Sequence, residues 1–158
     1  YTNEEESARF LKEARKQGIK TPLIGETTLL GQKVIELAGD AANGVKGHVG
    51  LTADAPIPAV QEFAKKFKAR FNYVNDHNGI KGYVAVYMIK AVTEKIGKFD
   101  SKLFASTLHG MTIKPEQEPG ILMEASWDAN GDIDRASFLA EIVDGKQKIV
   151  EILPKLNK

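Results

Sequence analysis

The residue types that most often catalyse reactions or bind metals are few in this sequence and form no recognisable motif. His48, His77 and His109 are scattered, with no i,i+4 pair and no carboxylate at ligand spacing. The chain has no cysteine, which excludes disulfides, thiolate catalysis and cysteine-based metal sites. The sequence also lacks a GxSxG nucleophile elbow and a Walker-type phosphate loop. We therefore expect no enzymatic activity, no cofactor and no bound metal.

One acidic segment resembles a calcium-binding loop at first sight. Asp128-Ala129-Asn130-Gly131-Asp132 places carboxylate and amide oxygens at alternate positions. However, Ile133 stands where such a loop needs its glycine, and Leu139 stands where it needs a bidentate glutamate. The Asn-Gly pair instead predicts a tight turn.

Two polar segments come just before predicted helices, where free backbone amides favour an anionic group. Asn3 is suited to cap a helix that begins with three glutamates, and Glu26 precedes a second helix that Thr27 or Thr28 is expected to cap. In open α/β sheets, ligands bind beyond the carboxyl ends of strands at such helix starts. We therefore expect Asn3 and Thr27 to donate or accept hydrogen bonds from a ligand. Helix capping alone is the alternative role for both residues.

Alternating helices and strands position these segments in the first third of the chain. Apolar residues at helical spacing predict a helix from Asn3 to Gly18, and a second helix is expected to end at Gly39. Residues 21–25 predict a short buried strand and residues 45–51 a second strand. This order is typical of a parallel sheet with covering helices.

After Leu51 the pattern becomes mainly helical, and then strands follow. The expected elements are a proline-bearing loop at 52–58, a helix at 58–71, a turn at 75–79, a long helix at about 80–96 and a short helix capped by Asp100. Strands at 136–143 and 146–153 flank Asp144-Gly145, which is a strong β-hairpin signal.

The composition is that of a globular protein, with 42% apolar and 27% charged residues. The net charge of +1, from 22 basic and 21 acidic residues, gives no electrostatic footprint for nucleic acid or an anionic membrane. Lys65, Lys66, Lys68 and Arg70 lie opposite phenylalanines on the predicted helix, which indicates a solvated face. No apolar run approaches the ~20 residues of a membrane span. The abrupt start at Tyr1 suggests a cut end.

Four segments together resemble the type I periplasmic binding proteins that serve ABC transporters for leucine, isoleucine and valine. They are Leu11 to Gly25 (LKEARKQGIKTPLIG), Leu37 to Val45 (LAGDAANGV), the helix around Tyr83 to Ala91, and Trp127-Asp128 with Gly131-Asp132. They occur in the order of the family and span nearly the whole chain. The resemblance implies an α/β fold with a parallel sheet, flanking helices and a C-terminal hairpin.

The resemblance further implies that the fold is incomplete and holds pieces of two lobes, which close around a ligand in a cleft. Residues 1–50 would belong to the second lobe, residues 51–131 to the first, and residues 132–158 to the hairpin and crossover strands. The N-terminal half of the parent chain would be missing. The unpaired sheet edges and uncovered apolar faces lead us to expect a homodimer or swapped assembly.

The resemblance also assigns ligand-binding positions. Family members bind the ligand ammonium through an acidic residue at the position of Thr27, and here Glu26 precedes it. Asn3 takes an aromatic position of the family, and Asn78 lies on the expected first-lobe rim. The implied function is a periplasmic receptor that delivers a small carboxylate-bearing ligand, such as a branched-chain amino acid or a related aromatic acid, to a membrane permease. The alternatives are a ligand sensor that controls a regulatory partner and, from another class, a small α/β enzyme.

Overall fold

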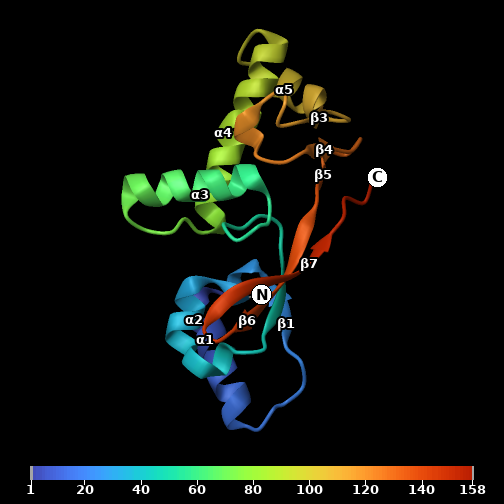
Figure 1. The fold of residues 1–158 in the computed structure, drawn as a ribbon. Helices are drawn as coiled ribbons and strands as arrows, with labels where there is room; N and C mark the ends of the chain where they lie inside the picture. Colours follow the sequence, from blue (N-terminus) through green and yellow to red (C-terminus); the bar gives the residue numbers. More distant parts are fainter. Residues whose placement is uncertain (1, 158) are drawn as a thin grey trace. The chain divides into compact units, whose positions relative to one another are not determined.

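The computed structural model describes residues 2–157, and the chain forms two compact units. Unit 1 comprises residues 1–55 and 137–153, and unit 2 comprises residues 56–136 and 154–158. The chain therefore passes from one unit to the other three times (Figure 1). Among the described residues, no helix combines the length and apolarity that crossing a membrane requires.

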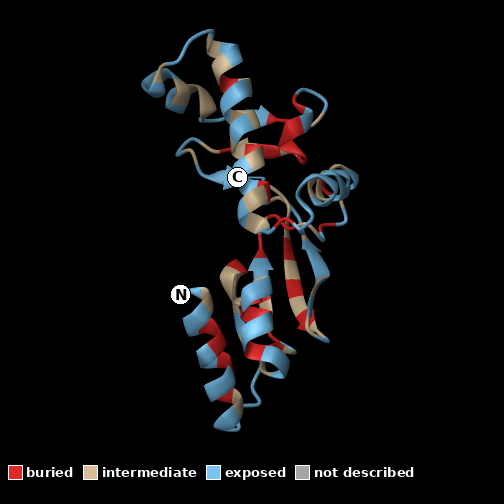
Figure 2. Ribbon diagram, turned by 90° about the vertical axis from the view of Figure 1, so that its left-hand side faces the viewer, coloured by how far each residue is buried: buried red, intermediate tan, exposed pale blue. Residues whose placement is uncertain are grey.

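Unit 1 is a four-stranded sheet in the order β1-β2-β6-β7, with α1 and α2 on one face (Figure 2). Its elements are α1 (Glu4–Lys16), β1 (Ile24–Glu26), η1 (Thr27–Leu30), α2 (Gln32–Ala38), η2 (Gly39–Ala42), β2 (Lys46–Val49), β6 (Ser137–Val143) and β7 (Lys146–Leu153). β1 and β2 are parallel, whereas β6 joins β2 antiparallel and pairs with β7 in the expected hairpin. The predicted α/β class is confirmed, and the sheet is mixed because β6 and β7 enter it as a hairpin.

The core of unit 1 follows the period-2 pattern of β6. Phe138, Ala140 and Ile142 are buried and alternate with half-buried residues, as a strand packed on one face requires. Gly47 pairs with Gly25 on the same face, and a Cβ on Gly47 would lie 2.9 Å from the carbonyl oxygen of Gly25. The two glycines therefore let η1 pack directly onto the sheet.

The prediction that residues 21–25 form a buried strand is wrong in position and in burial. The strand is β1, and Ile24 at its start is 72% exposed. β1 lies at the edge of the sheet and pairs only with β2. Ile24 and Glu26 alternate with Gly25, which faces Leu29, so their side chains project from the opposite face of the sheet.

Unit 2 consists of three α-helices and a small antiparallel sheet in the order β3-β4-β5. Its elements are α3 (Pro58–Phe71), α4 (His77–Ile96), α5 (Ser101–Leu108), β3 (Thr112–Ile113), η3 (Pro119–Ile121), β4 (Ala125–Trp127) and β5 (Ile133–Asp134). Phenylalanines of α3 stack on one another, and Phe63 also contacts Tyr83 of α4 with ring centroids 4.5 Å apart. Tyr83 in turn contacts Tyr87 at 4.8 Å. Aromatic stacking therefore joins α3 to α4.

η3 is locked onto α4 by a glycine and an ion pair. Gly120 is buried against the ring of Tyr87, where no side chain fits. Beside it, Lys90 donates to the buried Glu118 carboxylate at 2.6 Å, and the Gly120 amide donates to the same carboxylate at 3.3 Å.

The C-terminal segment is anchored to unit 2 by Asp134 at the end of β5. Its carboxylate accepts hydrogen bonds from the backbone amides of Leu156 at 2.9 Å and Asn157 at 2.7 Å. Lys155 adds a contact to Glu124 at 2.9 Å. The segment that follows β7 is therefore held in unit 2 by Asp134 and Glu124.

Candidate functional site

Four of the five residues that the sequence predicted to bind a ligand lie at the end of β1 or at the start of the neighbouring α1. Glu26 ends β1, and Thr27 and Thr28 begin η1 directly after it. The first turn of α1 lies against the end of η1, because a Cβ on Gly31 would be 3.8 Å from Oε1 of Glu4. Asn3, Glu26, Thr27 and Thr28 therefore share one end of unit 1.

Asn3 caps α1 as predicted. Its Oδ1 accepts from the amide of Glu6 at 2.9 Å, and its own amide donates to the Glu6 carboxylate at 3.3 Å, which completes a capping box. Asn3 is exposed, so its Nδ2 atom stays accessible to another molecule. Tyr1, which the sequence grouped with Asn3, lies outside the described residues.

The expected cap at Thr27 or Thr28 is wrong. Residues 27–30 form a 3-10 helix whose N-cap is Glu26, and α2 begins only at Gln32 after an extended Gly31. Thr27 is buried and its hydroxyl donates to the carbonyl of His48 on β2 at 3.1 Å. Tertiary packing decides this geometry, since η1 must fold onto the paired glycines of β1 and β2. Thr27 therefore joins η1 to β2, and Thr28 is half-buried at its side.

The acidic side chains at this end of unit 1 differ in their partners. Lys33 contacts Glu5 at 3.1 Å and Glu4 at 3.9 Å, and the hydrogen bond to Glu5 is the main cause that raises the pKa of Lys33. Glu26 makes no side-chain cap, and its carboxylate has no ion-pair partner among the described residues. Glu26 is thus the carboxylate of this region that remains free to bind a cation.

Asn78, the fifth predicted residue, lies in unit 2. The expected turn at residues 75–79 is wrong, because α4 already begins at His77. The cause is Asp76, whose side chain caps the helix by accepting from the amide of Gly79 at 2.7 Å. Asn78 is therefore an exposed residue of the first helical turn.

Sequence reasoning missed Asn75, which precedes this helix. Asn75 is 3% exposed, and neither its Nδ2 nor its Oδ1 atom has a hydrogen-bond partner among the described residues. The surrounding run of turn-forming residues hid this burial, and no local signal in the sequence marks it.

The sequence of this chain matches the pattern of a known protein family. The pattern of the family described as periplasmic binding protein matches residues 2–147. The chain belongs to the periplasmic binding protein family. No curated protein matches it in a search of individual sequences.

Solved structures of proteins with this fold agree with that assignment. A leucine-binding protein from Thermotoga maritima superposes with a TM-score of 0.81 at 18% identity, over 96% of this chain and 43% of that one. A solute-binding protein of an ABC transporter from R. palustris, in complex with benzoate, gives 0.77 at 21% identity over 100% and 43%. A branched-chain amino-acid binding protein from Streptococcus pneumoniae, in complex with isoleucine, gives 0.75 at 16% identity over 98% and 43%.

This periplasmic binding protein chain therefore spans less than half the length of the solved structures that it matches. Those proteins are solute-binding proteins, and the fold they share with this chain is the predicted type I fold.

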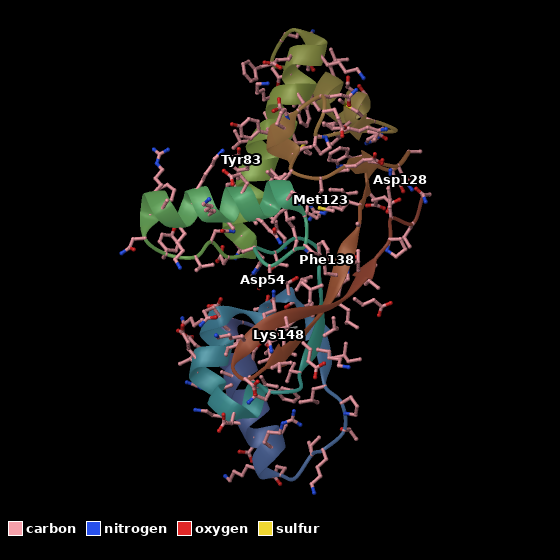
Figure 3. The ribbon with its side chains drawn as sticks, in the orientation of Figure 1. Asp54, Tyr83, Met123, Asp128, Phe138 and Lys148 are labelled. Carbon is pink, nitrogen blue, oxygen red and sulfur yellow. The ribbon has the colours of Figure 1, made fainter. Side chains whose placement is uncertain are left out.

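Among residues 2–157, no group of three or more His, Cys, Asp or Glu side chains is placed to hold a metal ion. The segment that resembles a calcium loop is the predicted turn (Figure 3). Asp128 Oδ1 accepts from the amides of Asn130 at 2.8 Å and Asp132 at 2.9 Å, and Gly131 has a positive φ of 86°. The oxygen of Asp128 thus stabilises the turn itself.

Proposed function

We propose that this chain forms part of an extracytoplasmic solute receptor that binds a small carboxylate-bearing ligand and delivers it to an ABC permease. The observation that carries the proposal is the family match over residues 2–147. Its fold relatives bind leucine, isoleucine and benzoate, which all carry a carboxylate. The same proposal places the protein in the periplasm.

In this proposal Asn3, Glu26, Thr27 and Thr28 contribute to ligand binding from unit 1, and Asn78 contributes from unit 2. The N-terminus of α1 offers amides that favour a carboxylate, and Asn3 can donate through Nδ2. Glu26 has no ion-pair partner among the described residues and is suited to bind an ammonium group. It ends β1, one residue before Thr27, where the resemblance placed the acidic position of the family.

Glu26→Gln is the cleanest test of this placement, since Glu26 makes no side-chain hydrogen bond whose loss would unfold the protein. Thr27→Val and Asn3→Ala are less clean, because each also removes a structural hydrogen bond worth about 1 kcal/mol. Glu151→Gln, at an exposed position of β7, provides a control with the same change of charge.

Isothermal titration calorimetry on the full-length protein should first establish binding to leucine, isoleucine, valine or benzoate. If an amino acid binds, Glu26→Gln should weaken it tenfold or more, as the loss of a charged hydrogen bond implies, whereas Glu151→Gln should not. Unchanged affinity in Glu26→Gln, Thr27→Val and Asn3→Ala would place the site elsewhere. Absence of binding to every carboxylate would refute the function itself.

A further inference from the structure

One side of the second half of α4 in unit 2 lies open. Val86 is 64% exposed and Ile89 is 45% exposed, although both are large apolar residues. A surface helix of a folded protein normally presents polar and charged residues on its solvent side. Two exposed apolar residues one turn apart on the same helix therefore need an explanation.

These two residues belong to a stripe that carries no charge. Because an α-helix has 3.6 residues per turn, positions spaced alternately three and four apart lie along one line of it. The line through Val86 and Ile89 continues to Thr93 and Ile96, which are half-buried. The charged residues of this part of the helix all fall outside that line. We call Val86, Ile89, Thr93 and Ile96 the α4 seam, and their spacing is typical of a helix that packs against an apolar partner.

The other sides of α4 already have partners within unit 2. The helix packs on η3 and α5, and its buried residues are Ile80, Val84 and Val92. Tyr87 covers the buried Gly120 of η3 with its ring. Apolar residues therefore occur on opposite sides of α4, and a helix with this distribution is typically buried in the core of a larger protein.

The size of the seam argues against a second copy of the chain as its cover. Residues 86–96 at 1.5 Å per residue make a stripe about 16 Å long, and at a width of ~10 Å the stripe offers roughly 160 Å². A stable interface between two molecules buries about 800 Å² on each partner. A segment of the same polypeptide needs no such area, because it does not lose the freedom of a separate molecule when it packs.

The lengths of the fold relatives show that such a segment has room to exist. The three solved structures described above are more than twice as long as this chain, since it spans 43% of each. More than half of each relative therefore lies outside the part that matches these residues.

We propose that the α4 seam is covered by an apolar segment of the same polypeptide that lies outside residues 1–158, in the part of the fold that the longer relatives carry. Val86 and Ile89 then become core residues of unit 2, and α4 becomes a helix with partners on all sides. This inference rests on the family match and on the packing of α4, and it does not depend on the ligand or on the permease.

Cysteine accessibility in the full-length protein tests the proposal, because residues 1–158 contain no cysteine of their own. Val86→Cys places a thiol in the seam, and Lys95→Cys, at an exposed position of α4 outside the seam, is the control. Maleimide labelling, located by mass spectrometry of peptides, should be about tenfold or more slower at position 86 than at position 95 in the native protein, because a covered thiol reacts only when the structure opens. In denaturant the two rates should become equal.

Two outcomes of the labelling overturn the inference. Equal rates at positions 86 and 95 in the native protein mean that the seam is open to solvent. Protection of position 86 that is lost on dilution means that a second copy covers the seam.

Thermal unfolding of the full-length protein gives an independent readout. Val86→Glu should lower the melting temperature by roughly 10 °C, because it places an unpaired charge in a covered face. Lys95→Gln changes the net charge by the same amount at an exposed position and should shift the melting temperature by no more than ~2 °C. A Val86→Glu variant that melts with the wild type overturns the inference. Neither readout involves a ligand, so that result leaves the proposed function intact.

Discussion

Replacing Gly120 by alanine is expected to destabilise unit 2 strongly. A Cβ on this buried glycine would overlap Cγ, Cδ1 and Cδ2 of the Tyr87 ring. Gly120 is not among the glycines with positive φ, so alanine is compatible with its backbone and the cost comes from the overlap alone. The ring has little room to move away, since Tyr87 packs against Tyr83, which in turn packs against Phe63.

The magnitude follows from the cost of inserting a methyl group into a packed core. Such overpacking costs about 1–3 kcal/mol, and the upper end applies here because the overlap is with ring atoms held in a stack. In a domain of 60–100 residues, each kcal/mol lowers the melting temperature by ~4–8 °C. The Gly120→Ala variant should therefore unfold roughly 12–24 °C below the wild type.

Differential scanning calorimetry measures this shift, and Gly82→Ala is the matched control. Gly82 lies inside α4, and a Cβ on it would meet no atom within 4 Å. Alanine should stabilise the helix there by about 0.5–1 kcal/mol. The same substitution is thus expected to have opposite signs at the two positions, and a Gly120→Ala variant that melts with the wild type would refute the packing argument.

Alkaline titration of the tyrosines gives a second readout. Burial, together with the neighbouring Tyr87 hydroxyl, raises the pKa of Tyr83 to about 12. Displacement of Tyr87 in the Gly120→Ala variant should lower the pKa of Tyr83 toward its ordinary value, whereas Gly82→Ala should leave it unchanged.

Three further predictions concern the polar contacts of unit 2. The hydrogen bond from Lys90 lowers the pKa of Glu118 below its unfolded value, so this stabilisation is present at neutral pH and lost as the pH falls through the lowered pKa. Denaturant unfolding at neutral pH and at about pH 3 should therefore show a larger acid loss in the wild type than in Glu118→Gln. Asp134→Ala should speed hydrogen exchange at the Asn157 amide, with Asp134→Asn intermediate; equal exchange in all three proteins would contradict the anchoring role. Asp100→Ala removes the cap of α5, which has no buried residue, so a loss of about 1 kcal/mol should appear as faster amide exchange throughout that helix.

Elements with local signals could be predicted from the sequence. Asn3 and the three glutamates after it specify the start of α1, and Asp144-Gly145 specifies the hairpin of β6 and β7. In each case the turn or cap chemistry lies within a few residues, so no distant contact is needed to read it.

Elements fixed by distant partners could not be predicted. Thr27 looks like a helix cap in the sequence, but its hydroxyl bonds to the carbonyl of His48 and η1 packs onto two glycines of different strands. Ile24 looks like a core residue, but its strand lies at the edge of the sheet. The burial of Asn75 likewise depends on packing around it and not on the residues beside it.

The order in which the chain is made has a consequence for how unit 1 folds. β6 lies between β2 and β7 in its sheet, with Val49 opposite Phe138, yet all of residues 56–136 are synthesised between β2 and β6. At ~5–20 residues per second, this interval lasts roughly 4–16 s. Throughout that time the edge of β2 that β6 later covers is open, and an open strand edge is a template for pairing with other strands. Unit 2 has most of its sequence in one stretch and can begin to fold first.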